Sequence, residues 1–186
     1  MNKNYELQII KIIENEAWLI DILKEIRELK LNDWYVAAGS IRNTIWNVLH
    51  GFSSNKNLKD IDIVYFDKSN LSKEKEQEIE LILKLKNPKF IFEVKNQARK
   101  HSIHPGLKIN SSCESIAYWS ETPTCIGVRL EENNKLTICA PHGLHDLMNL
   151  IVQPIPKPYQ DLELYKKRIE QKKWKNIWPR LKIVNV

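Results

Sequence analysis

The chain has 186 residues, a mass of 22.0 kDa and a formal net charge of +6. Its hydrophobic content of 42% is enough for one domain with a buried core, and the composition excludes disordered and collagen-like proteins. The charge is unevenly distributed, because residues 1–156 carry 20 basic and 20 acidic residues while residues 157–186 carry nine and three. We therefore predict a formally neutral body and a basic extension, with the net charge belonging to the extension and not to a site in the body.

The cysteines and the apolar runs indicate the compartment. Cys113, Cys125 and Cys139 form no Cys-x-x-Cys pair, and an odd number in a short chain argues against a disulfide framework. We expect reduced thiols, with Cys139 acting as a small buried hydrophobe. No apolar run approaches the roughly 20 residues of a membrane span, and no signal-peptide core is found near the N-terminus. These features predict a cytoplasmic protein without a membrane partner.

Hydrophobic spacing predicts the elements in chain order. Residues 5–30 are expected to form one long amphipathic helix, part of an N-terminal segment 1–31 that packs on the body. The further predicted elements are a strand over 34–38, a helix over 41–49, a strand over 61–66, a helix over 72–86 capped by Ser72, a strand over 89–95, a hairpin over 126–139, a short helix over 143–150 and a last helix from residue 162. This order predicts an α/β (α+β) fold, in which helices flank a small mixed β-sheet.

A proline-rich connector marks the one predicted domain boundary. Prolines at positions 154, 156 and 158 favour a stiff extended segment. We therefore predict a domain over residues 1–156 and a basic helical extension over residues 157–186.

The segment KDIDIVYF (59–66) carries the first candidate site. Side chains in a strand alternate between its two faces, so Asp60 and Asp62 point the same way on an otherwise apolar strand. Two carboxylates on one face repel each other, and a bound cation would compensate this repulsion. Carboxylate oxygens are hard ligands, which suit Mg²⁺ or Mn²⁺. The alternative is an exposed strand start at which Lys56 and Lys59 neutralise the two acids.

The segment AAGSIRN (37–43) joins a predicted strand to a predicted helix. Gly39 lets backbone amides approach a phosphate, Ser40 offers a hydroxyl donor and Arg42 a bidentate clamp at the helix N-terminus. Taken alone, Gly-Ser before a helix is also a common turn and cap. Neither G-x-G-x-x-G nor a P-loop motif occurs, which argues against dinucleotide-binding and P-loop mechanisms.

Glu93 is the third candidate acid. It lies in the apolar segment KFIFEVK (89–95), where a central carboxylate needs a partner. If this strand lies beside 61–66, Glu93 joins Asp60 and Asp62 as a ligand or accepts a proton from an attacking hydroxyl. The alternative is a pairing of Glu93 with Lys95 or Arg99 at a sheet edge.

Two polar segments further along the chain carry weaker signals. The first offers donors for a phosphate or a base edge, or else forms a capped basic turn; its residues are Asn96, Gln97 and Arg99. The second either lines a nucleotide pocket or is a polar loop before a hairpin; its residues are Glu121, Thr122 and Thr124. Three tryptophans are predicted to be core residues in preference to base-stacking platforms: Trp34, Trp46 and Trp119.

A zinc site is a competing interpretation. Cys139, His142 and His145 have Cys-x₂-His-x₂-His spacing, and His101 and His104 add two imidazoles. Zinc sites use four ligands in a recognisable arrangement of pairs, whereas these residues fall at a predicted Pro-His-Gly turn. The sequence therefore favours the carboxylates over zinc.

The combination of motifs resembles a known superfamily. The chain resembles the DNA polymerase β-like nucleotidyltransferases. The resemblance rests on a strand that ends in Gly-Ser, a helix within the nineteen residues that follow (41–59), the pair Asp60 and Asp62, and Glu93 on a later strand. The segments AAGSIRNTIWNVLHG, KDIDIVYFD, EVKNQARKH, TCIGVRL and APHGLHDLMNLIVQPIP are similar to a bacterial group of nucleotidyltransferase-like proteins. The spacing between Gly-Ser and the first acid also resembles that of the tRNA CCA-adding and poly(A) polymerases. The resemblance covers about residues 34–156.

The resemblance implies a polymerase β-like fold and a function. By it, Gly39 and Ser40 hold a triphosphate, while Asp60, Asp62 and Glu93 bind Mg²⁺ (or Mn²⁺) and catalyse transfer of a nucleoside monophosphate from an NTP by a two-metal mechanism. The acceptor stays open among RNA, a small molecule and a protein. The alternative is a non-catalytic nucleotide- or RNA-binding module that retains the fold.

The basic C-terminal helix has two interpretations. It either steers a polyanionic acceptor or is a solvated helix packed through Leu162, Tyr165 and Ile169.

Overall fold

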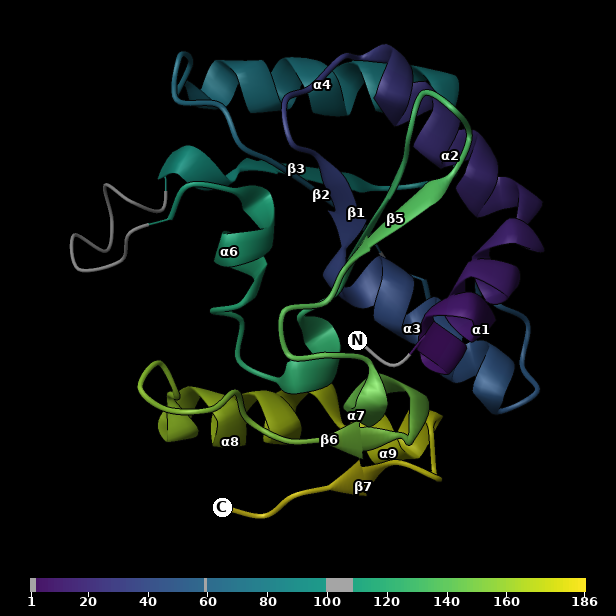
Figure 1. Cartoon of the computed structure of the whole chain (residues 1–186), viewed down its shortest axis with the longest axis vertical. Coiled ribbons are helices and arrows are strands. Elements are labelled where there is room, and N and C mark those ends of the chain that lie inside the picture. Colours follow the sequence, from purple (N-terminus) through teal and green to yellow (C-terminus); the bar gives the residue numbers. More distant parts are fainter. Residues whose placement is uncertain (1–2, 59, 100–108) are drawn as a thin grey trace.

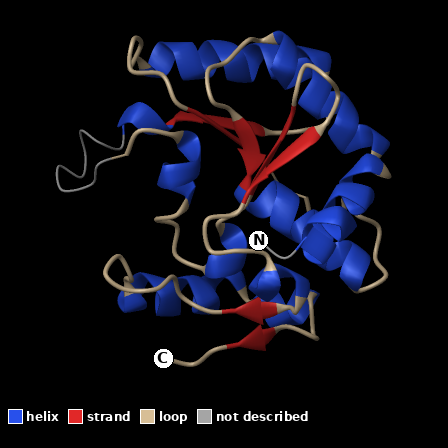
Figure 2. Ribbon diagram, viewed as in Figure 1, coloured by secondary structure: helices blue, strands red, loops and turns tan. Residues whose placement is uncertain are grey.

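The computed structural model describes residues 3–58, 60–99 and 109–186. Its main sheet has five strands and lies in the upper half of the view in Figure 1. The strands are β1 (Tyr35–Ala37), β2 (Ile61–Tyr65), β3 (Phe92–Asn96), β4 (Gly127–Leu130) and β5 (Leu136–Cys139). They are ordered β3-β2-β1-β4-β5, with β2 and β3 parallel and the other neighbours antiparallel. Helices surround this sheet (Figure 2). The predicted fold class, a mixed sheet flanked by helices, is confirmed.

The helices cover the sheet and extend below it. They are α1 (Lys3–Glu14), α2 (Ala17–Glu28), α3 (Ala38–Leu49), α4 (Lys73–Lys86), α6 (Ser112–Ile116), α7 (His145–Met148), α8 (Leu162–Lys172) and α9 (Trp174–Ile177), with short 3-10 turns η1 (Gln97–Arg99) and η2 (Thr122–Thr124). In the described ranges, none of the helices combines the length and the apolarity that a membrane crossing requires.

Two predicted helices illustrate what local spacing can and cannot decide. The helix over 72–86 is confirmed as α4, and the Ser72 hydroxyl accepts the backbone N–H of Lys75 as an N-cap. The single helix over 5–30 is wrong, because α1 and α2 are separated around Glu16, whose backbone is not helical (φ −101°, ψ 84°). The Glu16 carboxylate accepts hydrogen bonds from Trp18 Nε1 and the Ser54 hydroxyl, contacts that hold the break in place.

Strand alternation decides which face of the sheet carries the core. Ile61, Ile63 and Tyr65 of β2 are buried in one cluster with apolar residues of α1, α2 and α4. Asp62 and Val64 point to the opposite face, and Val64 packs there in a smaller second cluster. Asp62, the acidic residue of β2, is therefore kept out of the main core and faces the other side of the sheet.

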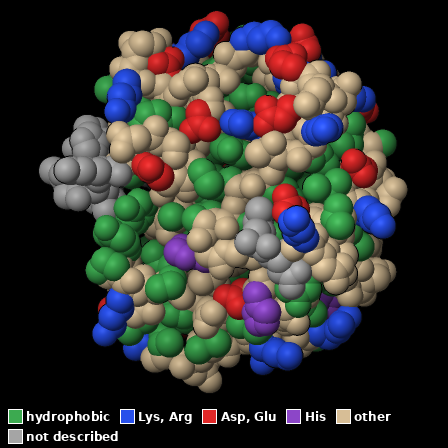
Figure 3. Space-filling view, viewed as in Figure 1, with side chains coloured by type: hydrophobic (Ala, Val, Ile, Leu, Met, Phe, Trp, Pro, Cys, Tyr) green, Lys and Arg blue, Asp and Glu red, His purple; other side chains and the backbone are tan. Residues whose placement is uncertain are grey.

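The C-terminal residues pack against the rest of the chain. β7 (Lys182–Ile183) pairs in parallel with β6 (Ile151–Val152), and Tyr165, Trp174 and Trp178 belong to the main core cluster. Trp178 is 1% exposed and its Nε1 donates to Asn47 Oδ1 at 2.8 Å. Basic side chains nevertheless gather over this lower rim in the view of Figure 3, whereas both signs mix over α4. The division of the chain at residue 156 stays a prediction.

The expectation that all the cysteines are reduced is wrong in the structure. Cys113 of α6 and Cys139 at the end of β5 form a disulfide with their Cα atoms 5.8 Å apart, and Cys125 is free and buried. The number of cysteines does not show which pair packing brings together, because the two lie 26 residues apart on elements that meet only in the folded chain. Cys139 is therefore a bridge residue and not merely a small hydrophobe.

Candidate active site

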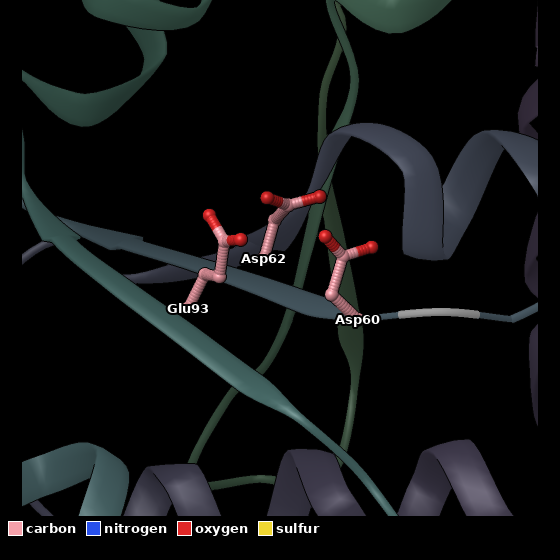
Figure 4. A group of neighbouring side chains, drawn as sticks. All are labelled: Asp60, Asp62 and Glu93. Atoms are coloured by element: carbon pink, nitrogen blue, oxygen red, sulfur yellow. The ribbon is translucent and has the colours of Figure 1, made fainter. Parts of the chain in front are cut away.

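Three carboxylates converge on the face of the sheet opposite the helical core. Asp60 directly precedes β2, Asp62 lies in β2, and Glu93 of β3 is paired in register with Asp62. One carboxylate oxygen from each residue lies within 4.8 Å of the others. The three side chains point to the same side of the two strands, with Asp62 between its neighbours (Figure 4). The strand of Glu93 therefore lies beside the strand of Asp62, which is the condition under which the sequence predicted that Glu93 joins the two aspartates.

The ionised form of Asp62 is unfavourable without a cation. The pKa of Asp62 is raised to about 6, first by burial and then by the negative charges of Asp60 and Glu93. The Arg42 guanidinium and the backbone N–H of Gly39, which donates to the carboxylate, oppose this rise in pKa without cancelling it. A divalent cation would relieve the repulsion, so the donor set fits a hard metal ion such as Mg²⁺ or Mn²⁺.

The start of α3 lies directly beside the acids. Ala37 of β1 is paired with Asp62, and α3 begins at Ala38 and not at residue 41 as predicted, so that the Gly-Ser pair forms its first turn. Ala38, and not the glycine, has the left-handed backbone (φ 51°). A methyl group on Gly39 would lie 3.7 Å from Asp62 Oδ2 and 3.8 Å from Arg42 Nη2. Gly39 therefore lies between the carboxylate and the guanidinium, at a helix N-terminus that favours anions, and a methyl group there would make ordinary van der Waals contacts with both.

Of the two predicted phosphate-binding side chains that follow Gly39, Arg42 reaches the cavity and the Ser40 hydroxyl does not. The Ser40 side chain is fully buried, and its hydroxyl donates to the Ala37 carbonyl at 2.6 Å. A phosphate contact of Ser40 would therefore use its backbone N–H and not its hydroxyl. Arg42 lines the cavity beside the acids, and burial lowers its pKa to about 10, opposed chiefly by the negative charge of Glu121. At that pKa the guanidinium is still a cation at neutral pH.

The residues that follow β3 reach the cavity, but their polar groups are used to hold the chain. The Asn96 side-chain amide donates to the carbonyls of Asp67 and Asn70, and its oxygen accepts the backbone N–H groups of Asp67 and Ala98. The Gln97 side chain bonds Ser115 and the backbone of Lys95. Arg99 forms an ion pair with the buried Glu76 at 3.3 Å. Substrate binding by Asn96, Gln97 and Arg99 stays a prediction.

The acids, the start of α3 and the C-terminal helix enclose one cavity of about 860 Å³. Its cationic lining comes from several elements: Arg42, Lys95, Arg99, Arg168 and Lys172. Aromatic side chains complete it: Tyr118, Trp119, Trp174 and Trp178. The expectation that the C-terminal charge lies away from the site is wrong for Arg168 and Lys172. Their spacing of four places them on one helix face, but no local signal shows where that face packs.

The polar loop before the β4–β5 hairpin contributes two residues to this region. Glu121 is fully buried, and Thr124 is 4% exposed and lines the cavity. The Thr122 hydroxyl instead donates to Asp146 Oδ2 at 2.6 Å. The alternative of a merely polar loop is therefore incomplete, since Thr124 lines the cavity and its hydroxyl donates to the buried Glu121 at 2.9 Å.

The zinc alternative and the tryptophans are resolved by packing. Cys139 is bonded to another cysteine and is therefore not a free thiolate ligand. His142 Nε2 lies 2.8 Å from the Ala117 carbonyl, which leaves its Nδ1, and His101 and His104 lie outside the described residues. Within the described ranges, the one group of three or more metal-type ligands is the carboxylate cluster. Trp34 and Trp46 belong to the main core as predicted, whereas Trp119 is partly buried against the second cluster and also lines the cavity.

Comparisons with known proteins agree with this geometry. A nucleotidyltransferase family model matches residues 24–183. A solved structure described as a CCA-adding enzyme head domain is 33% identical, with a TM-score of 0.84, over 97% of this chain and 96% of that chain. A tRNA nucleotidyltransferase with a primer tRNA and an incoming ATP analog shares the fold at 15% identity and a TM-score of 0.56, over 88% of this chain and 46% of that chain. An apo tRNA-processing enzyme gives 16% identity and a TM-score of 0.53, over 100% of this chain and 45% of that chain.

No curated protein sequence matches the chain. The family model nevertheless spans most of it, and the 33% identical structure matches it over almost its full length. The chain therefore belongs to the nucleotidyltransferase family and is a nucleotidyltransferase with the head-domain fold of CCA-adding enzymes.

Proposed function

We propose that this protein transfers a nucleoside monophosphate from an NTP to an acceptor in a reaction that depends on Mg²⁺ or Mn²⁺. An acceptor oxygen or nitrogen attacks the α-phosphorus, and the bond from that phosphorus to the bridging oxygen breaks. Pyrophosphate leaves with the bonding electron pair, and the acceptor loses a proton. The observation that carries this proposal is the convergence of Asp60, Asp62 and Glu93 within 4.8 Å on the wall of the cavity.

The carboxylates are the residues that would hold the metal ions. Their hard oxygen donors suit Mg²⁺ or Mn²⁺, and burial together with the charges of Asp60 and Glu93 raises the pKa of Asp62, although Arg42 opposes the rise. When bound, such ions neutralise phosphate charge and lower the pKa of an acceptor hydroxyl. Glu93, the exposed member of the group, is the carboxylate best placed to take the acceptor's proton.

The rest of the cavity would bind and orient the NTP. The first turn of α3 has no side-chain cap at its N-terminus and lies beside Asp62. The Ala38 N–H donates to the Ile126 carbonyl at 3.0 Å and the Gly39 N–H donates to the Asp62 carboxylate, so a phosphate at this turn would be bound by the Ser40 N–H and by the positive end of the helix dipole. Arg42 adds a fixed cation next to that turn. The phosphates would thus lie between the helix terminus and the carboxylates, which places the α-phosphorus beside the acids.

The decisive experiment pairs Asp62→Asn with a matched surface control, Asp21→Asn on α2, whose side chain is 68% exposed. Binding of Mn²⁺ together with a non-hydrolysable NTP is measured by calorimetry, and transfer is followed with NTPs labelled at the α-phosphate. We expect Asp62→Asn to reduce transfer at least about 100-fold, because a lost metal ligand removes several kcal/mol of transition-state stabilisation. Equal transfer by both variants would refute the metal-dependent mechanism. NTP binding without transfer to any acceptor would instead establish the non-catalytic binding module.

RNA is the first acceptor to test, ahead of small molecules and proteins, because the structures similar to this one include a CCA-adding enzyme head domain and a tRNA nucleotidyltransferase bound to a primer tRNA. Exposed lysines of α8, among them Lys166 and Lys167, would then contact the polyanion. The variant Lys166→Glu/Lys167→Glu should weaken RNA use and flatten its salt dependence while leaving small-molecule transfer unchanged. An unchanged salt dependence would remove the polyanion contact from the proposal.

A further inference from the structure

A buried polar cluster joins the C-terminal helix to the cavity wall. The Glu121 cluster, as we define it, consists of Glu121, Thr124, Arg168 and Arg42. Glu121 is fully buried and accepts two hydrogen bonds from Arg168 of α8, from Nε at 2.5 Å and from Nη2 at 3.2 Å. The Thr124 hydroxyl donates to Glu121 Oε2 at 2.9 Å and accepts from Arg42 Nη1 at 2.6 Å. One carboxylate thus connects two arginines that both line the cavity.

The Arg42 guanidinium also lies against two tryptophan rings, whose centres are 5.9 Å apart. Its guanidinium carbon lies 4.9 Å from the ring centre of Trp46 in α3 and 4.6 Å from that of Trp174 in α9. Its Nε and Nη2 donate to Asn43 Oδ1 at 3.2 Å and 2.9 Å. The hydrogen bonds found within the described residues use three of its five N–H donors, so two remain for a ligand in the cavity. The guanidinium is therefore fixed in orientation and still able to bind an anion.

We propose that Glu121 and Thr124 are positioning residues, which hold Arg42 and Arg168 as one anion-binding wall facing the carboxylates. The cluster contains two guanidinium groups and one carboxylate, so it keeps a net positive charge for an anionic ligand. Fork-shaped arginine donors match phosphate oxygens, which makes a polyphosphate the ligand class that fits. The identification of that ligand with the NTP triphosphate rests on the proposed function, whereas the anion site itself does not.

The sign of one measurement separates a positioning role from a simple charge effect. The probe is inorganic triphosphate, titrated by calorimetry into the metal-free protein in EDTA, so that the carboxylate site contributes no metal. Glu121→Gln removes a negative charge beside two arginines, and Coulomb attraction alone would then tighten triphosphate binding. If Glu121 instead positions the arginines, its loss should weaken binding about tenfold or more despite the added net charge.

Thr124 allows a more conservative test. Thr124→Val keeps the shape of the side chain but removes the hydroxyl between Glu121 and Arg42, and we expect triphosphate binding about tenfold weaker. Thr124→Ser restores the hydroxyl and should recover affinity to within about threefold of the wild type. The matched control is Thr122→Val in the same turn, which removes a hydroxyl bonded to Asp146 and not to Arg42. It should lower the melting temperature without changing triphosphate affinity.

Transfer kinetics add a second readout. Thr124→Val should raise KM for the NTP about tenfold while kcat changes less than about twofold, because the anion wall binds phosphate in both ground and transition state. The proposal is overturned if Thr124→Val and Thr122→Val bind triphosphate alike, if Glu121→Gln binds it more tightly, or if the wild type does not bind it.

The test of the proposed function is independent of the test of the anion-binding wall. Asp62→Asn should abolish metal-dependent transfer without weakening triphosphate binding in EDTA. If the wild type binds triphosphate as expected but no metal-dependent transfer occurs, the proposed function fails while the anion wall stands.

Discussion

Asp62→Asn should stabilise the metal-free protein at neutral pH, although it removes a residue of the proposed site. Asparagine has the shape of aspartate and keeps an oxygen that accepts the Gly39 N–H. It removes the ionised form of a carboxyl group whose pKa is raised to about 6 by burial and by Asp60 and Glu93. The ionised carboxylate is therefore an unfavourable feature of the folded state when no cation is present.

The sign and size follow from linkage. The pKa of Asp62 in the unfolded chain is close to the ordinary value of about 3.9, below its value in the folded protein. As the pH rises from about 4 to 6, the unfolded chain has released its proton while the folded protein still binds one, so wild-type stability falls through this window and stays low above it. The difference between the two pKa values corresponds to roughly 3 kcal/mol at most. That is a large share of the 5–15 kcal/mol typical of domain stability.

The assay is urea unfolding of wild type and Asp62→Asn in EDTA at pH 8 and at pH 4. We expect the variant to be more stable by up to about 3 kcal/mol at pH 8 and by only about 0.5 kcal/mol at pH 4. The control Asp21→Asn should stay within about 0.5 kcal/mol of the wild type at both pH values. Mn²⁺ at about 100 times its dissociation constant should stabilise the wild type by about 2.7 kcal/mol and the variant far less.

Two results would refute this reasoning. One is a variant that is less stable than the wild type at pH 8 in EDTA. The other is a gain in stability of the same size at pH 4 and pH 8, which would show that the effect does not come from ionisation of Asp62.

Three further predictions concern the packing around the site. Trp178→Phe should cost about 1–3 kcal/mol in urea unfolding, because it removes the buried donor of Asn47 Oδ1, and an unchanged midpoint would contradict this. Breaking the Cys113–Cys139 disulfide, by a reductant or by serine at both positions, should cost roughly 3–4 kcal/mol for a closure of 26 residues; a wild type insensitive to reductant would show that the bridge contributes nothing. Deleting residues 157–186 should abolish cooperative unfolding, since core side chains are lost, and a well-folded 1–156 would establish an independent domain.

The local part of the fold was predictable from the sequence. Apolar spacing located the helix over 72–86 together with its Ser72 cap, and it located the strands that carry Asp62 and Glu93, to within a few residues. These predictions succeeded because periods of two and of about 3.6 residues are local properties of strands and helices. They failed at Glu16, where a side-chain contact with Ser54 stabilises a break that the spacing does not reveal.

The candidate site was predictable only in part. The sequence placed Asp60 and Asp62 on one face of a strand and Gly39 just before a helix, and the structure brings these residues together. It also predicted a phosphate-binding hydroxyl at Ser40, whereas the structure buries that hydroxyl against a carbonyl. The reason is that α3 begins three residues earlier than its apolar spacing indicates, which turns Ser40 inward.

By itself, the sequence determined the order of the chemical groups: a glycine before a helix, an Asp-x-Asp strand and a third acid on a later strand. Only the tertiary structure decided their neighbours. Parallel pairing of β2 with β3 places Glu93 beside Asp62, and packing of α8 brings Arg168 to Glu121, 47 residues earlier in the chain. Local periodicity determines on which face of a helix or strand a side chain lies. Which other element packs against that face depends on how all the elements together bury the core. No local motif marks the basic C-terminal segment, and it forms part of the wall of the cavity beside the carboxylates only when the chain folds.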